Sequence, residues 1–201
     1  MISSKEMFSR FNEVSFDYES LINNNEYKKQ YSTEAIGLEI GYYSKSKTDL
    51  YINGIKRGRL ISKIPKTFDG FIYYFDDNKM VMASRMVNNR EVDITFLDYS
   101  EQYCFGYTYA VADRLIPRRC FVYEMDADRI IGFKYSNSYH IDGEIKPPAI
   151  IIDEKYSYSN EGLCSIEVTN SFYDFDSGNE RFNNHMICDY YNGKYWLPSN
   201  L

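Results

Sequence analysis

The sequence predicts a mainly β protein: an antiparallel meander of hairpins, arranged as a barrel, a sandwich or a propeller-like sheet, with a short helical segment at the amino-terminal end. Three observations lead to this fold class. Short aromatic and apolar runs alternate with turn signals, from Asn53-Gly54 to Asn192-Gly193. Tyrosine, which favours strands, accounts for 21 of the 201 residues. No βαβ rhythm is present, so the sheet is expected to be antiparallel.

One motif recurs at a spacing of 50 residues, at 71–77 (FIYYFDD), 121–127 (FVYEMDA) and 171–177 (SFYDFDS). The tyrosine and the aspartate keep their register in all three copies. Each copy is typical of a strand that runs into a polar turn. The recurrence is either a duplicated structural unit or a chance match within a tyrosine-rich sheet, and the hairpin prediction is the same in both cases.

The first element is a helix at 3–12. Ser3 and Glu6 fit a capping box, and Met7, Phe8 and Phe11 share one face at helical spacing. A weaker helical pattern covers 18–31. The chain is therefore predicted to be a single domain with a helical segment at 1–34 and a β-hairpin-rich body at 35–201. In that body we expect strands at 36–40, 50–52, 71–75, 80–86, 92–97, 103–111, 121–125, 130–135, 149–152, 163–168 and 172–175, with a last hairpin at 190–196.

Composition limits the classes of function. The first residues lack the apolar run of a signal peptide, and no stretch approaches the roughly 18 apolar residues of a membrane span, which indicates a cytoplasmic protein. The four cysteines are widely spaced and never form a CxxC pair, so reduced thiols are expected rather than disulfides. His185 and Cys188 have ligand-like spacing, but two ligands do not make a zinc site. We expect neither a metal nor a cofactor.

Motifs for catalysis are missing. There is no GxSxG, GxGxxG or GxxxxGK[ST] sequence, and only His140 and His185 could act as an imidazole base. The stretch 174–180 hints at a calcium loop but lacks the third acidic position and the distal glutamate of an EF-hand. These absences favour a protein that is not an enzyme, although scattered carboxylates around either histidine leave that class open.

Charge is unevenly distributed along the chain. Residues 1–120 hold 17 Lys and Arg against 16 Asp and Glu, whereas residues 121–201 hold 6 against 13. Such an asymmetry indicates either a surface that meets a basic partner or a requirement for solubility. One segment, 45–66, is basic and lies beside tyrosines, so it could bind nucleic acid or could protect a sheet edge from aggregation. Its cations are Lys45, Lys47, Lys56, Arg57, Arg59, Lys63 and Lys66.

The chain as a whole resembles bacterial immunity proteins of contact-dependent growth inhibition and other polymorphic toxin systems. It is acidic, lacks a leader, is rich in Asn, Ile, Lys and Tyr, and carries no catalytic motif. The resemblance implies a stoichiometric inhibitor that binds a cognate toxin domain, often a basic nuclease. A module that binds nucleic acid through 45–66 and an uncharacterised enzyme are the alternatives.

Carboxylates and aromatic anchors on turns would suit such a basic partner. If the three repeats are equivalent, their turns emerge on one side of the sheet and form one binding surface. The predicted contact residues are Asp76, Asp77, Glu124, Asp126, Asp128, Tyr173, Asp174, Phe175, Asp176 and Glu180.

Overall fold

The fold is seen in a computed structural model that describes residues 1–24, 26–33, 46–52, 54, 58–127, 129–137, 140–141, 144–145, 149–191 and 193–196. The expected strand at 36–40 and the turn residues Asn53 and Asn192 lie outside these ranges.

The amino-terminal helix forms as predicted. Helix α1 spans Ser4–Glu13, and the side chain of Ser3 accepts a hydrogen bond of 3.1 Å from the Glu6 N–H. Helix α2 spans only Tyr18–Ile22 and ends at Asn23. The prediction of helix as far as residue 31 is wrong, because Lys28–Ser32 forms strand β1 and pairs with β3. Tertiary pairing here overrides a weak helical pattern. None of the helices in the described ranges is long and apolar enough to cross a bilayer.

The body is one large antiparallel sheet, which confirms the predicted fold class. Its strands follow the order β14-β13-β12-β11-β8-β7-β6-β5-β4-β3-β1-β2, so the sheet is a meander for most of its width and is open, with β14 and β2 at its edges. A separate two-stranded ribbon, β9 and β10, lies between β8 and β11 in the chain. The strand bounds are β2 Leu60–Ile61, β3 Gly70–Asp76, β4 Lys79–Val87, β5 Arg90–Tyr99, β6 Tyr103–Val111, β7 Leu115–Asp126, β8 Arg129–Asn137, β9 His140–Ile141, β10 Glu144–Ile145, β11 Ala149–Ser159, β12 Gly162–Asp174, β13 Asn179–Tyr191 and β14 Lys194–Trp196.

Two local predictions change. The expected strands at 163–168 and 172–175 are almost entirely one strand, β12. The expected strand at 50–52 is instead part of a short helical segment, η1, at Thr48–Ile52. A three-residue apolar run does not distinguish a strand from a helical turn, and here its packing against the sheet decides.

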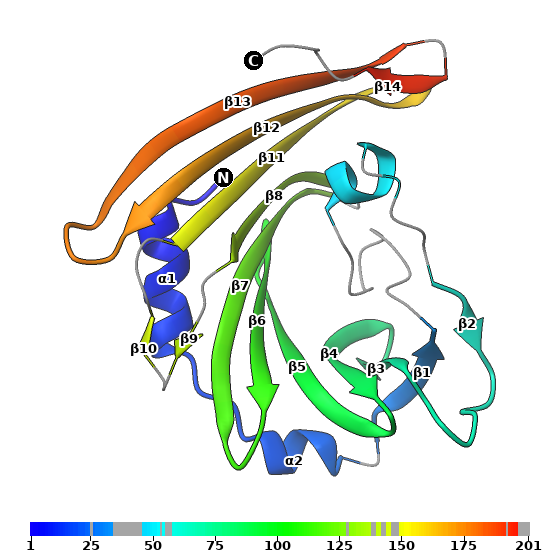
Figure 1. Cartoon of the computed structure of the whole chain (residues 1–201). Helices are drawn as coiled ribbons and strands as arrows, with labels where there is room; N and C mark the ends of the chain where they lie inside the picture. Colours follow the sequence, from blue (N-terminus) through cyan, green and yellow to red (C-terminus); the bar gives the residue numbers. More distant parts are fainter. Residues whose placement is uncertain are drawn as a thin grey trace.

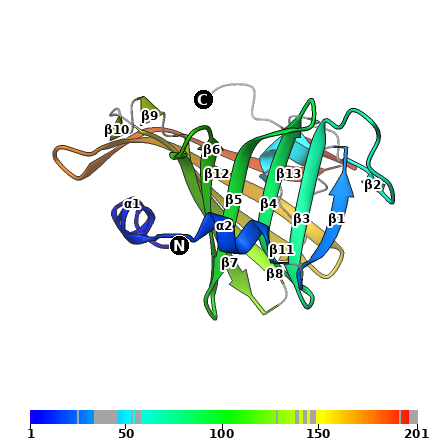
Figure 2. The same cartoon turned by 90° about the horizontal axis from the view of Figure 1, so that it is seen from below.

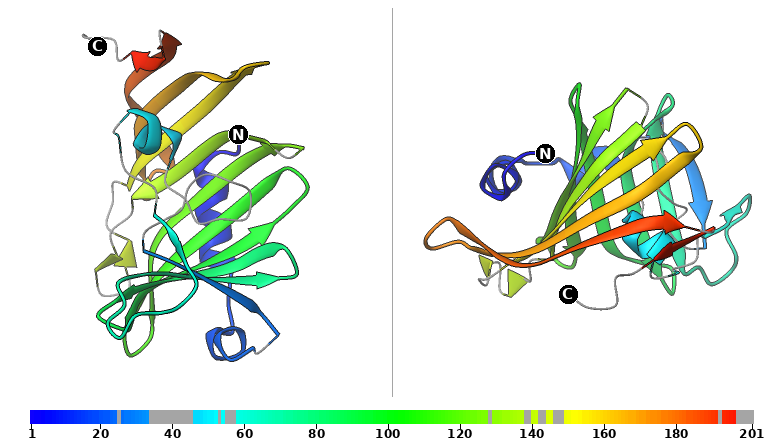
Figure 3. Two further views of the ribbon diagram at one scale, coloured as in Figure 1. Left: turned by 90° about the vertical axis from the view of Figure 1, so that its right-hand side faces the viewer. Right: turned by 90° about the horizontal axis from the view of Figure 1, so that it is seen from above.

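The sheet is strongly curved, so that β3–β6 and β11–β13 form two arms joined through β7 and β8, with η1 on the inner side (Figure 1). Views from below and from above place α1 outside the curve (Figure 2, Figure 3). Alternation along the strands gives each face its own core. On the outer face, α1 and the residues after it pack against β5, β6 and β12. On the inner face, a second core includes Phe121, Tyr123, Phe133 and Tyr156, and Ile52 of η1 packs against it.

One glycine is fixed by close packing on this inner face. Gly106 pairs with Phe121 of the neighbouring strand, and a Cβ added at Gly106 would lie 2.0 Å from the Phe121 ring. The aromatic ring thus takes the space that a side chain would fill, which explains a glycine in the interior of a central strand.

Candidate functional site: an acidic rim and a tyrosine pocket

Consecutive antiparallel strands bring alternate turns to the same end of the sheet. The β3–β4, β5–β6, β7–β8, β11–β12 and β13–β14 turns all lie at one end, which we call the acidic rim. Neighbouring hairpins in a sheet are two strand spacings apart, or about 10 Å. The first four of these turns each carry exposed carboxylates, namely Asp76, Asp77, Glu101, Asp126 and Glu161.

Turn geometry fixes two of the positions on this rim. Asp77 and Ala127 occupy equivalent places after the β3 and β7 strands and share a left-handed backbone, with φ of 52° and 50°. Both hairpins also contain a bulge just before the turn. The first two copies of the motif that recurs every 50 residues therefore have the same local structure, and both end at the acidic rim.

The cations of this rim are partly engaged by tyrosines. Lys79 lies over the Tyr99 ring, 4.1 Å from its centroid, and Arg129 lies over the Tyr158 ring at 4.9 Å. Against five exposed carboxylates, the described turns carry three cations, the third being Lys194. The rim is therefore net negative, and two of its three positive charges already face aromatic rings.

The third motif copy lies at the opposite end of the sheet. Three strand-to-strand steps separate β12 from β7 in the sheet, so β12 runs antiparallel to β7 and its turn emerges on the other rim. In Figure 1 this β12–β13 turn lies at the far left, while the β13–β14 hairpin lies at the right. The expectation that all three turns share one side is wrong, because strand direction depends on how many strands intervene, not on sequence similarity.

Residues of this third copy have local structural roles. The ring of Tyr173 is buried and lies 5.0 Å from the ring of Phe8, and Phe175 lies 4.7 Å from Phe8, so both predicted anchors pack against α1. The Asp174 carboxylate accepts hydrogen bonds from the N–H groups of Asp176 (2.9 Å) and Ser177 (3.3 Å). A hydrogen bond from the Ser177 side chain and these backbone bonds lower the pKa of Asp174. These hydrogen bonds within a polar turn account for an aspartate at position 174, so a role as a calcium ligand is not needed to explain it.

Two further predicted contacts are engaged within the chain. The Glu124 carboxylate forms an ion pair with the Met1 amino group, with 2.9 Å between the nitrogen and the oxygen, and is only partly exposed. Glu180 accepts hydrogen bonds from the hydroxyls of Ser4 and Ser171, which ties α1 to the β12–β13 hairpin. Asp176 is exposed on the opposite rim, and Asp128 lies outside the described residues. Of the predicted set, Asp76, Asp77 and Asp126 are brought to one exposed surface.

A pocket of about 550 Å³ lies at the β13–β14 end of the acidic rim. Three separate segments form it: η1, the β11–β12 turn and the β13–β14 hairpin. The Tyr195 ring lies between two others, with centroids 5.5 Å from Tyr51 and 5.1 Å from Tyr190. Burial, followed by the neighbouring tyrosines, raises the pKa of Tyr195. The lining residues, which we call the tyrosine pocket, are Tyr51, Glu161, Leu163, Tyr190, Gly193, Lys194 and Tyr195.

Sequence reasoning missed this pocket. Tyr51 lies more than 100 positions before the other lining residues, and each tyrosine taken alone is indistinguishable from sheet surface. The sole signal was the Tyr190-to-Trp196 cluster of aromatic residues around a tight turn, which identified the hairpin but not what faces it.

His185 does not belong to a recognisable catalytic group among the described side chains. The Nε2 atom of His185 lies 2.9 Å from the Glu167 carboxylate, and both residues are partly buried. Residues His185 and Cys188 are three apart on one strand, so they face opposite sides of the sheet and cannot share a metal ion. Within the described ranges, no group of three or more metal-ligating side chains occurs. The side chain of His140 is not among those described.

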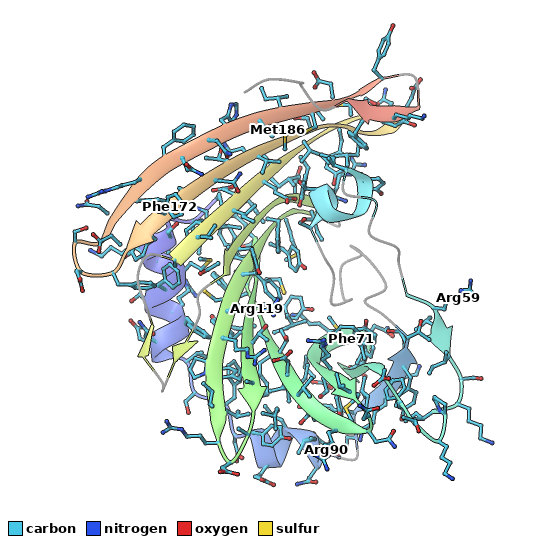
Figure 4. The ribbon with its side chains drawn as sticks, viewed as in Figure 1. Arg59, Phe71, Arg90, Arg119, Phe172 and Met186 are labelled. Carbon is cyan, nitrogen blue, oxygen red and sulfur yellow. The ribbon has the colours of Figure 1, made fainter. Side chains whose placement is uncertain are left out.

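The basic segment divides on folding. Lys47 is buried on the inner face, where its ammonium group lies over the rings of Tyr156 (5.3 Å) and Tyr158 (5.7 Å). Arg59, Lys63 and Lys66 are exposed around the short edge strand β2, and Lys45, Lys56 and Arg57 lie outside the described residues. Arg59 lies beside β2, far from Phe172 and Met186 on β12 and β13 (Figure 4). Cations beside an edge strand agree with protection of that edge.

Comparison with known proteins identifies no relative: no family model matches the chain, and no curated protein or solved structure is detectably similar to it.

Proposed function

We propose that this protein is a stoichiometric inhibitor that binds and neutralises a basic protein partner, as an immunity protein binds its cognate toxin. The observation that carries the proposal is the acidic rim, where four successive hairpins present exposed carboxylates at one end of a wide sheet. The compositional resemblance to immunity proteins of polymorphic toxin systems gives independent support. Under this proposal the protein acts in the cytoplasm and needs no catalytic group of its own.

The physics of the rim fits a nuclease domain as partner. Nucleases that hold phosphates present clefts rich in Lys and Arg, and a row of carboxylates is complementary to such a cleft. Complementary charge accelerates association and disfavours acidic partners. Measured along the curved edge of the sheet, four turns at spacings of about 10 Å extend over roughly 30 Å, which is comparable with the diameter of a small domain.

Only some of the carboxylates near the rim are placed to contact a partner. Asp76, Asp77, Glu101 and Asp126 are exposed and free to meet a partner's cations, whereas Glu124 is paired with the Met1 amino group. We therefore assign the electrostatic contact to the exposed turn residues rather than to the whole predicted set. Asp174, Asp176 and Glu180 belong to the opposite rim and are not part of it.

The test measures association with the cognate toxin domain, which the proposal expects a neighbouring gene to encode, by stopped flow over a range of ionic strength. Replacing four of the five rim carboxylates by amides, with Glu161 kept, should slow association about tenfold or more at low salt and flatten its salt dependence. Asn is compatible with the left-handed backbone at position 77, so the change leaves the turn intact. The rim variant is D76N/D77N/E101Q/D126N.

A matched control removes four other exposed carboxylates, on the helices and the opposite rim. This variant, E13Q/E19Q/D113N/D176N, has the same change in net charge and should keep most of the wild-type rate. Equal loss in both variants would show that net charge, not the rim, governs binding. Unchanged association in the rim variant would refute the proposal.

Nucleic-acid binding by the basic segment is the second candidate, supported by the exposed cations Arg59, Lys63 and Lys66. A triple variant, R59Q/K63Q/K66Q, separates the two. It should leave the protein complex unchanged, whereas salt-sensitive binding of an oligonucleotide that this variant abolishes would favour the second candidate.

A further inference from the structure

We infer that the tyrosine pocket binds a cationic side chain, an arginine or a lysine. The preference for a cation follows from the residues of the pocket itself. That the cation comes from a partner protein rests on the proposed function. The pocket would then hold one basic anchor of the partner while the acidic rim attracts the rest of its basic surface.

The rings of this pocket are accessible and held in place. Tyr51 and Tyr190 are 45 % and 51 % exposed, although large aromatic rings usually bury most of their surface. Tyr195 lies between them and donates a hydrogen bond of 3.1 Å from its hydroxyl to the carbonyl of Leu163. A tyrosine face carries partial negative charge, so a group of such faces attracts a guanidinium or an ammonium ion.

The same part of the sheet already holds cations in this way. Arg129 and Lys47 lie over the ring of Tyr158, at 4.9 Å and 5.7 Å, and Lys79 lies over Tyr99 on the same rim. These contacts show that tyrosines along these strands face positive groups in the folded chain. Tyr190 and Tyr195, on β13 and β14, and Tyr51, on η1, line an open pocket beside these contacts.

The two charged residues of the lining have opposite effects. The Glu161 carboxylate would pair with an incoming cation, and the Lys194 ammonium would repel it. Among the described residues, neither group takes part in an ion pair. A cation therefore gains from Glu161 and loses from Lys194, while a phosphate or another anion would show the reverse pattern. The sign of each substitution consequently reports the charge of the ligand.

The experiment titrates the full chain with N-acetyl-arginine amide and follows the tyrosine ring signals by NMR. The control ligand is N-acetyl-citrulline amide, a neutral ligand of the same length in which a urea carbonyl, an acceptor, replaces one donor nitrogen of the guanidinium. Adenosine monophosphate is the anionic probe, because it offers a stacking base and a phosphate. We expect saturable shifts at Tyr51, Tyr190 and Tyr195 with the arginine ligand, and binding about two- to fivefold weaker with citrulline.

Substitutions then test each part of the pocket. Tyr190→Leu and Glu161→Gln should each weaken arginine binding about two- to fivefold, and Lys194→Gln should strengthen it. Tyr190→Phe keeps the ring and should retain most of the affinity. Because these side chains are at the surface, spectra of the remaining residues should be unchanged, which confirms that each variant is folded.

Several results would overturn the inference. Equal binding of citrulline and arginine would show that charge is not recognised. Preferred binding of adenosine monophosphate, weakened by Lys194→Gln, would show an anion site. Absence of saturable shifts up to the solubility limit of the arginine ligand would show that there is no site.

Failure here is distinguishable from failure of the proposed function. If the arginine ligand binds and the toxin complex is insensitive to the rim variant, the pocket stands and the proposed function falls. If the rim variant slows the toxin complex and the arginine ligand does not bind, the proposed function stands and the pocket inference falls.

Discussion

Removal of the Phe8 ring should test whether α1 is an integral layer of the fold. Phe8 is 3 % exposed, and its ring lies 5.0 Å from Tyr173 and 4.7 Å from Phe175. The Phe8→Ala substitution leaves a cavity between α1 and β12. Replacements of a buried phenylalanine by alanine cost about 3–5 kcal/mol of unfolding free energy, a large part of the 5–15 kcal/mol typical of a domain.

The measurement is urea unfolding followed by circular dichroism, with thermal melting alongside. For a chain of this size, each kcal/mol shifts Tm by about 2–4 °C, so the expected decrease is about 6–20 °C. Phe182→Ala is the matched control, because it deletes the same atoms from a side chain that is 67 % exposed. It should change the unfolding free energy by no more than about 0.5 kcal/mol.

A double-mutant cycle assigns the effect to the ring contact. In a Tyr173→Ala background, Phe8→Ala should cost about 0.5–1.5 kcal/mol less than in the wild type, because the aromatic pair is already lost. A cost for Phe8→Ala no larger than that for Phe182→Ala would refute the reasoning. It would mean that α1 detaches locally and contributes little to the global stability.

Three more predictions follow from buried groups. Gly106→Ala places a Cβ 2.0 Å from the Phe121 ring and should destabilise the fold by about 1–3 kcal/mol, with partial recovery on adding Phe121→Leu, as measured by urea unfolding. Burial raises the pKa of Glu154, so the stability that its neutral form contributes is fully present below the unfolded-state pKa and is lost as the pH rises through the folded-state pKa. The Glu154→Gln substitution should therefore raise Tm at neutral pH and have a vanishing effect in acid. An equal effect on Tm at all pH values would contradict this prediction. Burial also raises the pKa of the Cys104 thiol to about 12, so a thiol reagent applied to the native protein should label Cys164 first, and rapid native labelling of all four cysteines would count against the burial pattern.

The sequence by itself determined the local structure. The cap at Ser3 and the spacing of Met7, Phe8 and Phe11 predicted α1, because helical periodicity is visible within ten residues. Alternation and turn residues predicted most of the strands from 71 onward for the same reason. Strand period and turn chemistry act over short distances, so neither needed knowledge of the partner strands.

Only the tertiary structure decided which turns share a rim. The motif copies at 71–77 and 121–127 end at the acidic rim, and the copy at 171–177 ends at the opposite one, because the number of strands between them sets their direction. The packing of α1 against β12 made Tyr173 a core residue. The tyrosine pocket needed still more, since Tyr51, Glu161 and Tyr195 meet only when the sheet curves and η1 lies on its inner side. Contacts between residues far apart in the chain depend on sheet order and curvature, and no short-range pattern in the sequence encodes either.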